Sequence, residues 1–424
     1  MRTILCREGL YYLAMVALVF MGAILREVNL LLLFGALLAC PVFIAWRLER
    51  KIMDQLKVYR KKPTGVVAGE VFHIPIEITN PRKKLSSWAI VIEDRIRLVR
   101  NGNSKKDRSK SNGQSKAFLR HESKTLSPAV YFEYIKAGAT LKKSYSGCIP
   151  RRGRYKIGPI VASTRFPVGF FRTSMQLETE LDQANEFLVF PRWGKMTSNW
   201  YAKQHQSDEN KQHRKQLRSS RVTGEFLGVR HWQSGDIKKW IHWRASAKHN
   251  ELVVRQYEQH QNRDASIILD LYQPSSPSIR EMEHIELAVS VAATLVNELA
   301  RRGGSNLLLG TFGNTDADEK DKTLQSGVDV MIGQICVPLI ESMMKRLAVI
   351  EPTDDDALPA LLLQMLSSSD PSADMFFVTH TPPDFERSDR FQSLRNDPRF
   401  RVLTQRIKII DTSSPTLDEI FMLD

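Results

Sequence analysis

The stretch GVRHWQSGDIKKWIHWRASAKHNELVVRQYE, residues 228 to 258, is dense in side chains that could do chemistry. A general base or a metal ligand could come from Asp236, His242, His249 or Glu258. The stretch contains no nucleophile elbow, no glycine-rich phosphate loop and no HExxH motif. The two histidines are seven residues apart, which is not the adjacent-turn spacing of a two-histidine metal site. The pattern therefore argues against catalysis here and calls for no cofactor.

The same stretch combines aromatic and basic side chains, a mixture that could bind nucleic acid through base stacking and phosphate contacts. These residues are Lys238, Lys239, Trp240, His242, Trp243, Arg244 and Lys248. Tryptophans at helical spacing belong more often to a core than to a stacking platform, so the pattern favours packing. The whole chain carries a formal net charge of +14, which attracts acidic lipid headgroups as well as nucleic acid.

Local signals divide this stretch into a turn, a helix and a strand. Ser234, Gly235 and Asp236 predict a turn, with Asp236 as the N-cap of a helix that continues to about Lys248. The following segment ELVVRQYE is typical of a strand. This division leaves open whether the basic side chains face a partner; the candidates are Arg230, Lys238, Lys239 and Lys248.

The block GEFLGVRHWQSGDIKKWIHWRASAKHNELVVRQYE resembles the signature of the domain-of-unknown-function 58 family. The matching positions are Gly224, Glu225, Phe226, Gly228, Arg230, Trp232, Gly235, Asp236, Ile241, Trp243, Ala247, Lys248, Leu252, Val254 and Glu258. The resemblance implies a C-terminal region similar to a von Willebrand factor A fold, and it implies MoxR-type AAA+ ATPases as partners. It implies no common reaction.

Strand-like and helix-like segments alternate from residue 263 to 424. The expected strands are ASIILDL, SNLLLGTFG, DMFFVTH and VLTQRIKII, and the expected helices are IREMEHIELAVSVAATLVNELARRGG, VDVMIGQICVPLIESMMKRLAVI and ALPALLLQMLSS. This alternation predicts a doubly wound, mainly parallel α/β sheet. Ligands of such sheets bind at the carboxyl ends of the strands.

A von Willebrand factor A fold carries a divalent-metal site at that edge, with an Asp-x-Ser-x-Ser motif after the first strand. Here Asp270 is followed by Tyr272 and Pro274 where the serines are expected, and His380 stands where a later Asp is expected. Hard oxygen ligands are therefore missing, and no working metal site is predicted. Asp270 and His380 remain degenerate candidates, and the acidic run 354–356 is interpreted as a helix N-terminal cap.

Two uncharged apolar runs, residues 10–25 and 30–46, lie near the N-terminus and are separated only by REVN. They predict a two-helix transmembrane hairpin over residues 1–50, which contacts membrane lipids through residues 10–46. Basic residues flank both outer ends, so the positive-inside rule places both ends and the soluble domains on the cytoplasmic side of the inner (plasma) membrane. Basic residues beside an anionic leaflet favour lipid over nucleic acid as the attracted polyanion.

The middle of the chain, residues 51–193, repeats short alternating apolar segments such as VFHIPIEIT and predicts an all-β, immunoglobulin-like sandwich. Residues 100–124 are polar and basic, and they are interpreted as a mobile insertion. A basic linker is expected over 194–222, followed by the signature helix and strand over 223–262 and the α/β domain over 263–424.

The preferred functional hypothesis is a membrane-anchored, non-enzymatic scaffold that docks a partner protein, such as a MoxR-type ATPase, at the cytoplasmic face. Two other hypotheses are weighed against it. One is a divalent-metal-dependent binding or hydrolytic protein that uses Asp270 and His380. The other is nucleic-acid binding through the basic loops, against which the scarcity of exposed aromatic residues in those loops argues.

Overall fold

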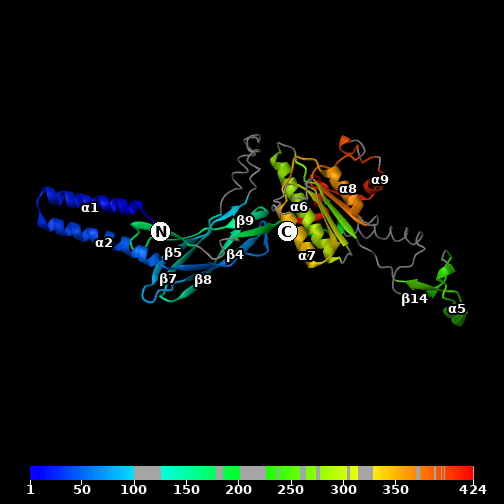
Figure 1. Cartoon of the computed structure of the whole chain (residues 1–424), viewed down its shortest axis with the longest axis horizontal. Coiled ribbons are helices and arrows are strands. Elements are labelled where there is room, and N and C mark those ends of the chain that lie inside the picture. Colours follow the sequence, from blue (N-terminus) through cyan, green and yellow to red (C-terminus); the bar gives the residue numbers. More distant parts are fainter. Residues whose placement is uncertain are drawn as a thin grey trace. The chain divides into compact units, whose positions relative to one another are not determined.

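The computed structural model describes residues 1–99, 126–177, 185–200, 226–234, 236, 238–257, 264–273, 277–302, 306–313, 328–368, 373–385, 388–392, 394–395 and 397–423. They form two compact units (Figure 1). The first is built mainly from Met1–Arg192, and the second from Trp193–Arg346 with Ile350–Asp424. The predicted insertion at 100–124 lies outside the described residues.

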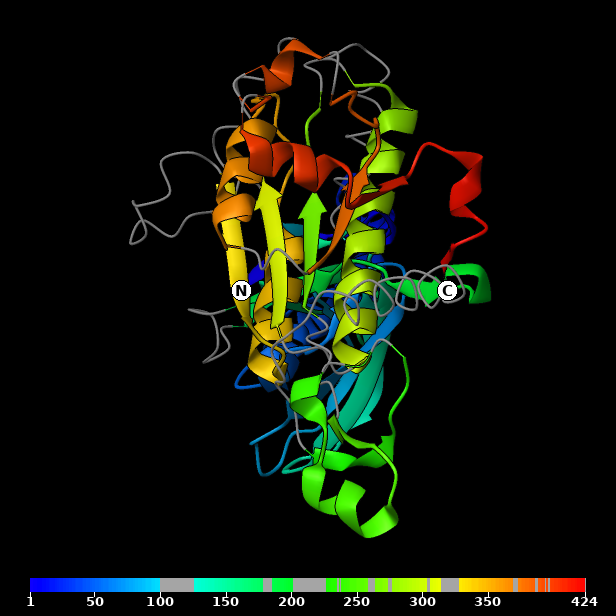
Figure 2. The ribbon, with the colours of Figure 1, turned by 90° about the vertical axis from the view of Figure 1, so that its right-hand side faces the viewer.

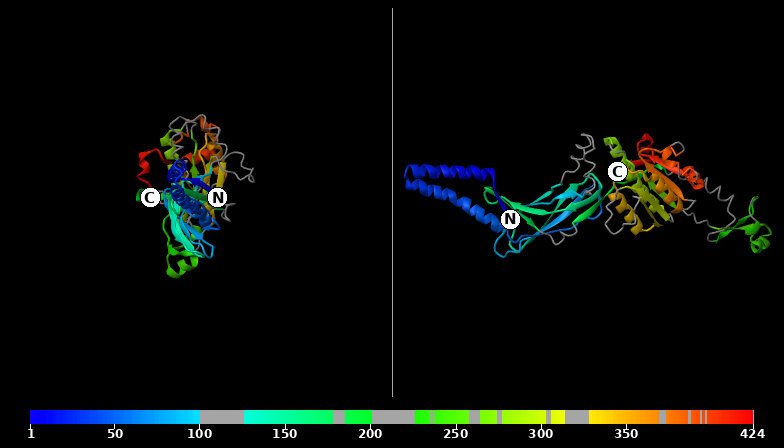
Figure 3. Two further views of the ribbon diagram at one scale, coloured as in Figure 1. Left: turned by 90° about the vertical axis from the view of Figure 1, so that its left-hand side faces the viewer. Right: turned by 45° about the horizontal axis from the view of Figure 1, so that its top comes forward.

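Two long apolar helices project from the first unit as an antiparallel hairpin (Figure 3). They are α1 (Arg7–Leu25) and α2 (Asn29–Met53), and both are long and apolar enough to cross a membrane. Large apolar side chains point outward, with Leu18 73% and Leu30 78% exposed. Apolar side chains arranged around the outside of a helix pair are typical of a lipid-facing surface.

Both ends of the hairpin are fixed in the same β-rich body. Before α1, strand β1 (Arg2–Leu5) pairs antiparallel with β11 (Phe171–Leu177). After the apolar run, α2 continues without a break until Ile52 and Met53, which are buried in the core of the strands. The two ends of the hairpin therefore lie on the same side of any membrane that it crosses, as the sequence predicts.

The last carbonyl groups of α2 are held by side chains of the β-rich unit. The Arg82 guanidinium donates to the Ile52 carbonyl at 2.8 Å and also to the Lys51 carbonyl. The Ser87 hydroxyl donates to Ile52 at 3.1 Å. Buried Glu49 accepts a hydrogen bond of 2.9 Å from the Thr173 hydroxyl on β11. Helix ends leave carbonyls without intrahelical partners, so these contacts fix the junction between α2 and the strands.

Three sheets surround one apolar core in the rest of this unit. Their strand orders are β1-β11-β10-β5-β7, β3-β12-β9-β6 and β2-β4-β8. Besides β1 and β11, these sheets contain β2 (Lys57–Arg60), β3 (Val66–Val67), β4 (Val71–Thr79), β5 (Ser87–Glu93), β6 (Ile96–Leu98), β7 (Ala129–Ile135), β8 (Thr140–Cys148), β9 (Gly153–Ile157), β10 (Ile160–Thr164) and β12 (Glu186–Phe190). Strand β4 shows why they form: its residues alternate, with Ile74, Ile76 and Ile78 fully buried.

A buried polar cluster connects the three sheets. Nη1 of Arg60, at the end of β2, lies 2.7 and 2.8 Å from the two carboxylate oxygens of Asp94. The Tyr145 hydroxyl on β8 donates to Asp94 at 2.8 Å, and Nη2 of Arg60 donates to the Asn185 side chain at 3.0 Å. The side chains of Arg60 and Asp94 are 3% and 0% exposed. Burial and the Asp94 carboxylate raise the pKa of Tyr145, so its hydroxyl stays protonated as the donor.

The second unit is an α/β body with one five-stranded sheet, ordered β18-β17-β16-β19-β20 (Figures 1 and 2). Strands β16, β17, β19 and β20 are parallel, and β18 runs antiparallel to β17. The strands are β16 (Ala265–Leu269), β17 (Asn306–Phe312), β18 (Val328–Gln334), β19 (Asp374–Thr379) and β20 (Ile407–Asp411). The helices are α6 (Ile279–Arg301), α7 (Val337–Val349), α8 (Leu358–Ser368) and α9 (Pro398–Thr404).

Helices cover the sheet because its central strands are apolar on both faces. All five residues of β16 are buried. Ile268 belongs to a core that also contains Leu361 of α8 and Phe400 of α9. Figure 2 shows α6 lying along the strands, and a capping box between Ser278 and Glu281 begins this helix. A parallel sheet with both faces buried follows from such continuous apolar strands.

Two expectations about this unit are wrong. The segment 328–350 was expected to be one helix, but its first seven residues form β18, which pairs with β17, and only α7 is helical. Val328, Val330 and Ile332 follow the period of a strand, and the β17 edge supplies the partner. The expected linker begins with strand β13 (Gly194–Met196), which pairs with β21 (Phe421–Leu423); residues 201–222 lie outside the described part.

Candidate functional site

The signature stretch forms a small hairpin-and-helix module, residues 226–257. Strands β14 (Phe226–His231) and β15 (Val253–Tyr257) pair antiparallel. Between them lie a single 3-10 turn, Lys238–Trp240, and the short helix α5 (Trp243–His249). Ile241, Val253 and Val254 are its buried apolar residues, and the Ser246 hydroxyl accepts a 2.9 Å hydrogen bond from the Val253 amide.

Asp236 does not cap a helix, contrary to expectation. Its carboxylate oxygens accept hydrogen bonds from Nη1 and Nη2 of Arg230, both at 2.7 Å, and from the Gln233 amide at 2.9 Å. The hydrogen bonds from Arg230 hold the pKa of Asp236 below its usual value. The helix starts later, where Nδ1 of His242 accepts from the Ala245 amide at 3.1 Å. The bridge between Ile241 and Val254 extends the chain just before α5, which prevents one continuous helix.

We expect Asp236→Ala to loosen the turn of this module while leaving α5 intact. The substitution removes a bidentate ion pair that is partly exposed, so the local cost is about 1 kcal/mol. Hydrogen exchange of the Gln233 amide should become roughly fivefold faster, whereas exchange of the Ala245 amide should not change. Equal acceleration at both amides would contradict this division between the turn and the helix.

Two of the module's three tryptophans are exposed, so the expectation that the tryptophans pack is wrong for these two. Trp243 is 67% exposed and Trp232 is 38% exposed. Val229 and Leu252 are also exposed large apolar residues. The basic residues on this surface are exposed as well: Lys238, Lys239, Arg244 and Lys248. Gly235 and Glu258 lie outside the described residues. The module is too small to bury its tryptophans, so it presents them together with positive charge.

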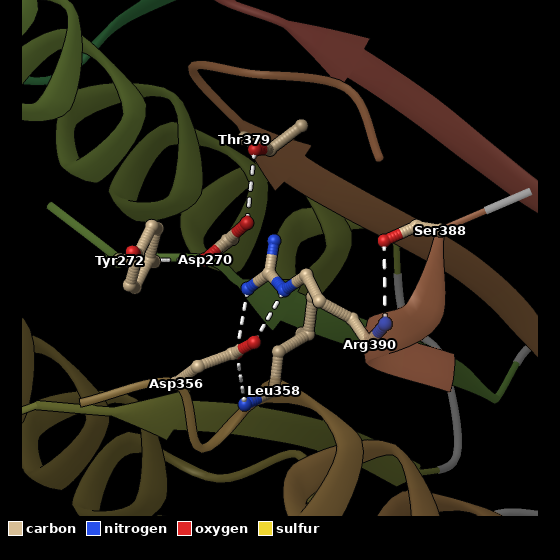
Figure 4. A network of polar contacts seen from close by, with 7 residues as sticks. All are labelled: Asp270, Tyr272, Asp356, Leu358, Thr379, Ser388 and Arg390. Atoms are coloured by element: carbon tan, nitrogen blue, oxygen red, sulfur yellow. Dashed lines mark hydrogen bonds and ion pairs between the residues drawn. The ribbon is translucent and has the colours of Figure 1, made fainter. Parts of the chain in front are cut away.

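The second candidate lies at the carboxyl ends of the parallel strands, around Asp270 after β16 (Figure 4). One Asp270 carboxylate oxygen accepts from the Thr379 hydroxyl at 3.1 Å, and the other accepts from the Tyr272 amide at 3.1 Å. Asp270 is 2% exposed. Burial raises its pKa to about 6, against the lowering effects of the Tyr272 hydrogen bond and the Arg390 charge.

An arginine that the sequence did not single out supplies the positive charge at this edge. Both guanidinium contacts of Arg390 go to the Asp356 carboxylate, which also accepts from the Leu358 amide at the start of α8 (Figure 4). The Arg390 guanidinium carbon lies 5.0 Å from the centroid of the Tyr272 ring. Asp356 therefore caps α8, as predicted, and binds Arg390 as well. No local pattern could have paired residues 34 positions apart.

The structure does not bring Asp270 and His380 together as joint ligands. Thr379, the last residue of β19, donates to Asp270, whereas the charges that act on His380 come from other residues. His380 is 7% exposed, burial lowers its pKa, and its nearby charges come from Glu281, His284 and Asp411. Within the described residues, no group of three His, Cys, Asp or Glu side chains could hold a metal ion.

A family model described as "Protein of unknown function DUF58" matches residues 228–325, which include most of the module and the sheet through β17. No curated protein matches the chain. One similar solved structure is Pseudomonas fluorescens alkylpurine DNA glycosylase AlkC bound to DNA containing an abasic site analog. It has 12% identity and a TM-score of 0.19, and the alignment covers 36% of this chain and 40% of that one.

Another similar structure is Se-Met labelled β-glucosidase from Kluyveromyces marxianus. It has 10% identity and a TM-score of 0.16, and the alignment covers 32% of this chain and 15% of that one. The chain thus spans well under half the length of either solved protein. Neither likeness supports an assignment of fold or function.

Proposed function

We propose that this protein is a membrane-anchored adaptor of the domain-of-unknown-function 58 family that docks a partner protein at the cytoplasmic face. The observation that carries the proposal is the surface of the 226–257 module, on which Trp232, Trp243 and the lysines Lys238 and Lys239 are all exposed. Tryptophan and positive charge together are typical of a protein-binding surface, because aromatic anchors supply most of the affinity and charge speeds association.

The architecture supports the anchoring role. Strand β1 and the buried end of α2 hold both ends of the hairpin in one body, so the membrane-proximal basic residues lie on the same side. These are Arg2, Arg7, Arg47, Arg50 and Lys51. The positive-inside rule assigns that side to the cytoplasm. We assign the β-rich unit to an immunoglobulin-like sandwich. Its strands are mainly antiparallel and share one apolar core, which supports this assignment.

We assign the second unit to a von Willebrand factor A-like fold, supported by four parallel strands with helices on both faces. In the proposal, the carboxyl edge of this sheet has a structural role and not a catalytic one. The Asp270 carboxylate already accepts hydrogen bonds from the Thr379 hydroxyl and the Tyr272 amide. The Asp356 carboxylate already accepts from the Leu358 amide and from Arg390. The partner that the family resemblance implies is a MoxR-type AAA+ ATPase.

The test is binding of a purified MoxR-type ATPase from the same source to the full-length protein in lipid nanodiscs. Trp243→Ala and Lys238→Glu/Lys239→Glu should each weaken the affinity at least tenfold, since interface tryptophans are common hot spots. The matched controls are Tyr131→Ala, which removes an aromatic side chain that is 50% exposed on β7, and Lys83→Glu/Lys84→Glu. Both controls should bind within twofold of the unmodified protein.

Two outcomes would contradict this proposal. Unchanged affinity of the Trp243→Ala protein would exclude the module as the docking surface. Absence of ATPase binding by the unmodified protein, together with a steeply salt-dependent binding of DNA or RNA that the lysine reversals remove, would replace the adaptor with a nucleic-acid-binding protein.

A further inference from the structure

A cavity of about 390 Å³ lies beside β4 in the β-rich unit, far from the 226–257 module in sequence. The chain leaves β2 at Arg60, runs outward through Lys61 and Lys62, and returns at β3. The cavity lies between this outward segment and the first half of β4, and its lining includes Lys61, Lys62, Val67, Glu70, His73 and Pro75. The volume lies within the range of about 300–1,000 Å³ that is usual for ligand pockets.

Within the described part of the chain, strand β4 has a neighbouring strand along its whole length on one side only. Strand β8 pairs with it from Val71 to Thr79. Strand β2 pairs only with its second half, from Ile76 to Thr79, and the last contact on that side is the Lys61 amide donating to the Pro75 carbonyl at 3.5 Å. Among the residues that the structure describes, no strand pairs with the edge of β4 from Val71 to Ile74, where the cavity lies.

The open edge exposes backbone groups that are ready to pair. In a strand, alternate residues direct their N–H and C=O groups to the same edge. Because the Pro75 carbonyl points toward β2, the backbone groups of His73 and Val71 point to this side too. An unpaired strand edge of this kind is a template for an added strand, which binds through main-chain hydrogen bonds.

The charge beside this edge is positive. Lys61 and Lys62 are exposed, and neither makes an ion pair within the described residues. Glu70 is the one carboxylate in the cavity lining, so the two lysines leave a local excess of one positive charge. An incoming strand with acidic side chains would meet complementary charge.

We propose that this edge binds an extended, acidic peptide segment of a partner protein, which adds a strand to β4 where β2 has ended. The peptide backbone pairs with Val71 and His73, and its carboxylates lie against Lys61 and Lys62. The proposal is independent of the module's docking role, because it rests only on the first unit.

The position on β4 favours a peptide over lipid headgroups. Thr79, at the other end of β4, pairs with Lys57, four residues after the end of α2. Val71 lies eight residues farther along, which is about 26 Å at roughly 3.3 Å per residue. A lipid also lacks the amide groups that would pair with the open edge.

The test measures fluorescence anisotropy of a labelled peptide, Val-Glu-Val-Glu-Val-Glu, with the full-length protein in nanodiscs of neutral phosphatidylcholine. We expect saturable binding that Lys61→Glu/Lys62→Glu weakens at least tenfold. The matched control is Lys83→Glu/Lys84→Glu, an adjacent exposed lysine pair in the β4–β5 loop outside the cavity lining, which should bind within twofold of the unmodified protein.

A second variant separates backbone pairing from charge. His73→Pro removes the amide hydrogen at the open edge, and the fold should survive because that edge carries no ladder bond there. Its peptide affinity should fall at least fivefold with an unchanged melting temperature. The same peptide with N-methylated amides should bind as weakly to the unmodified protein.

Three results would overturn the proposal. They are no binding of the peptide up to about 1 mM, equal binding of the N-methylated peptide, and displacement of the peptide by vesicles that contain phosphatidylserine. The last result would identify the edge as a lipid contact. Each result leaves the ATPase measurement on the 226–257 module unaffected, so the two proposals can fail separately.

Discussion

Replacing Arg60 by alanine is expected to destabilise the β-rich unit by about 3–5 kcal/mol, the largest effect of any substitution considered for this unit. The change leaves the Asp94 carboxylate, which is 0% exposed, without its cationic partner in the core. An isolated buried charge costs far more than the pair contributes, because water no longer solvates it. The measurement is denaturant-induced unfolding, monitored through hydrogen exchange of the β4 and β8 amides. These amides report on the β-rich unit alone.

Two controls distinguish the loss of a buried partner from the loss of any ion pair. Arg172→Ala removes a 2.8 Å pair with Glu93 whose side chains are 37% and 31% exposed, and it should cost about 1 kcal/mol or less. The triple change Arg60→Met/Asp94→Leu/Tyr145→Phe should recover most of the loss, because it removes both charges and the hydroxyl that donates to Asp94. A cost for Arg172→Ala as large as that for Arg60→Ala would contradict this explanation.

Asp270→Asn is expected to stabilise the α/β unit at pH 7.5 by up to about 3 kcal/mol. Burial raises the pKa of Asp270 to about 6, from 3.8 for the unperturbed group. Between these two values the folded state holds more protons than the unfolded state, so stability falls as the pH rises through this window. Above pH 6 the full cost of the buried charge is present, and two pKa units correspond to roughly 3 kcal/mol. The asparagine oxygen can still accept from the Tyr272 amide, and its NH2 group can donate to the Thr379 hydroxyl oxygen.

The readout is the difference in unfolding free energy between Asp270→Asn and the unmodified protein, measured from pH 4 to pH 8 through exchange of the β16 and β19 amides. The difference should grow from about pH 4 to pH 6 and then stay constant. Asp418→Asn, at an exposed residue near the C-terminus, should show no such growth. A difference of opposite sign would mean that the Asp270 carboxylate stabilises the fold, through Arg390, more than its burial costs.

Composition and the periodicity of apolar residues were enough to predict the elements whose pattern lies within their own sequence. The hairpin helices follow from two uncharged apolar runs, and β4 follows from strict alternation over nine residues. Helix α6 has both an apolar face and a complete capping box. These features are local, so a sequence alone displays them.

Elements that depend on a distant partner could not be predicted in this way. Strand β1 has only four residues, and it exists because β11 lies beside it. Strand β18 was assigned to a helix because its own seven residues do not reveal the β17 edge. Arg390 reaches Asp356 only after α8 and β19 have folded between them. Long-range pairing overrides local preference at each of these places.

The same competition explains the misplaced helix cap. Asp236 has a residue type that favours an N-cap, but Arg230 on β14 donates two short hydrogen bonds to it, and the backbone amide that it binds belongs to Gln233, which precedes it in the chain. His242 then takes over the cap of α5 through its ring nitrogen. Residue type therefore predicted that this segment would contain a capped helix, and the tertiary contact decided where the helix begins.

The continuation of α2 into the β-rich core has a mechanical consequence. Ile52 and Met53 are buried among the strands, and Arg82 and Ser87 hold the helix end. The end of α2 and the strands are therefore joined by side-chain contacts as well as by the chain itself. In a hairpin that spans a bilayer, a change of bilayer thickness that tilts α2 would therefore act on the strands through these contacts, and the tilt would change the position of the β4 edge relative to the membrane surface.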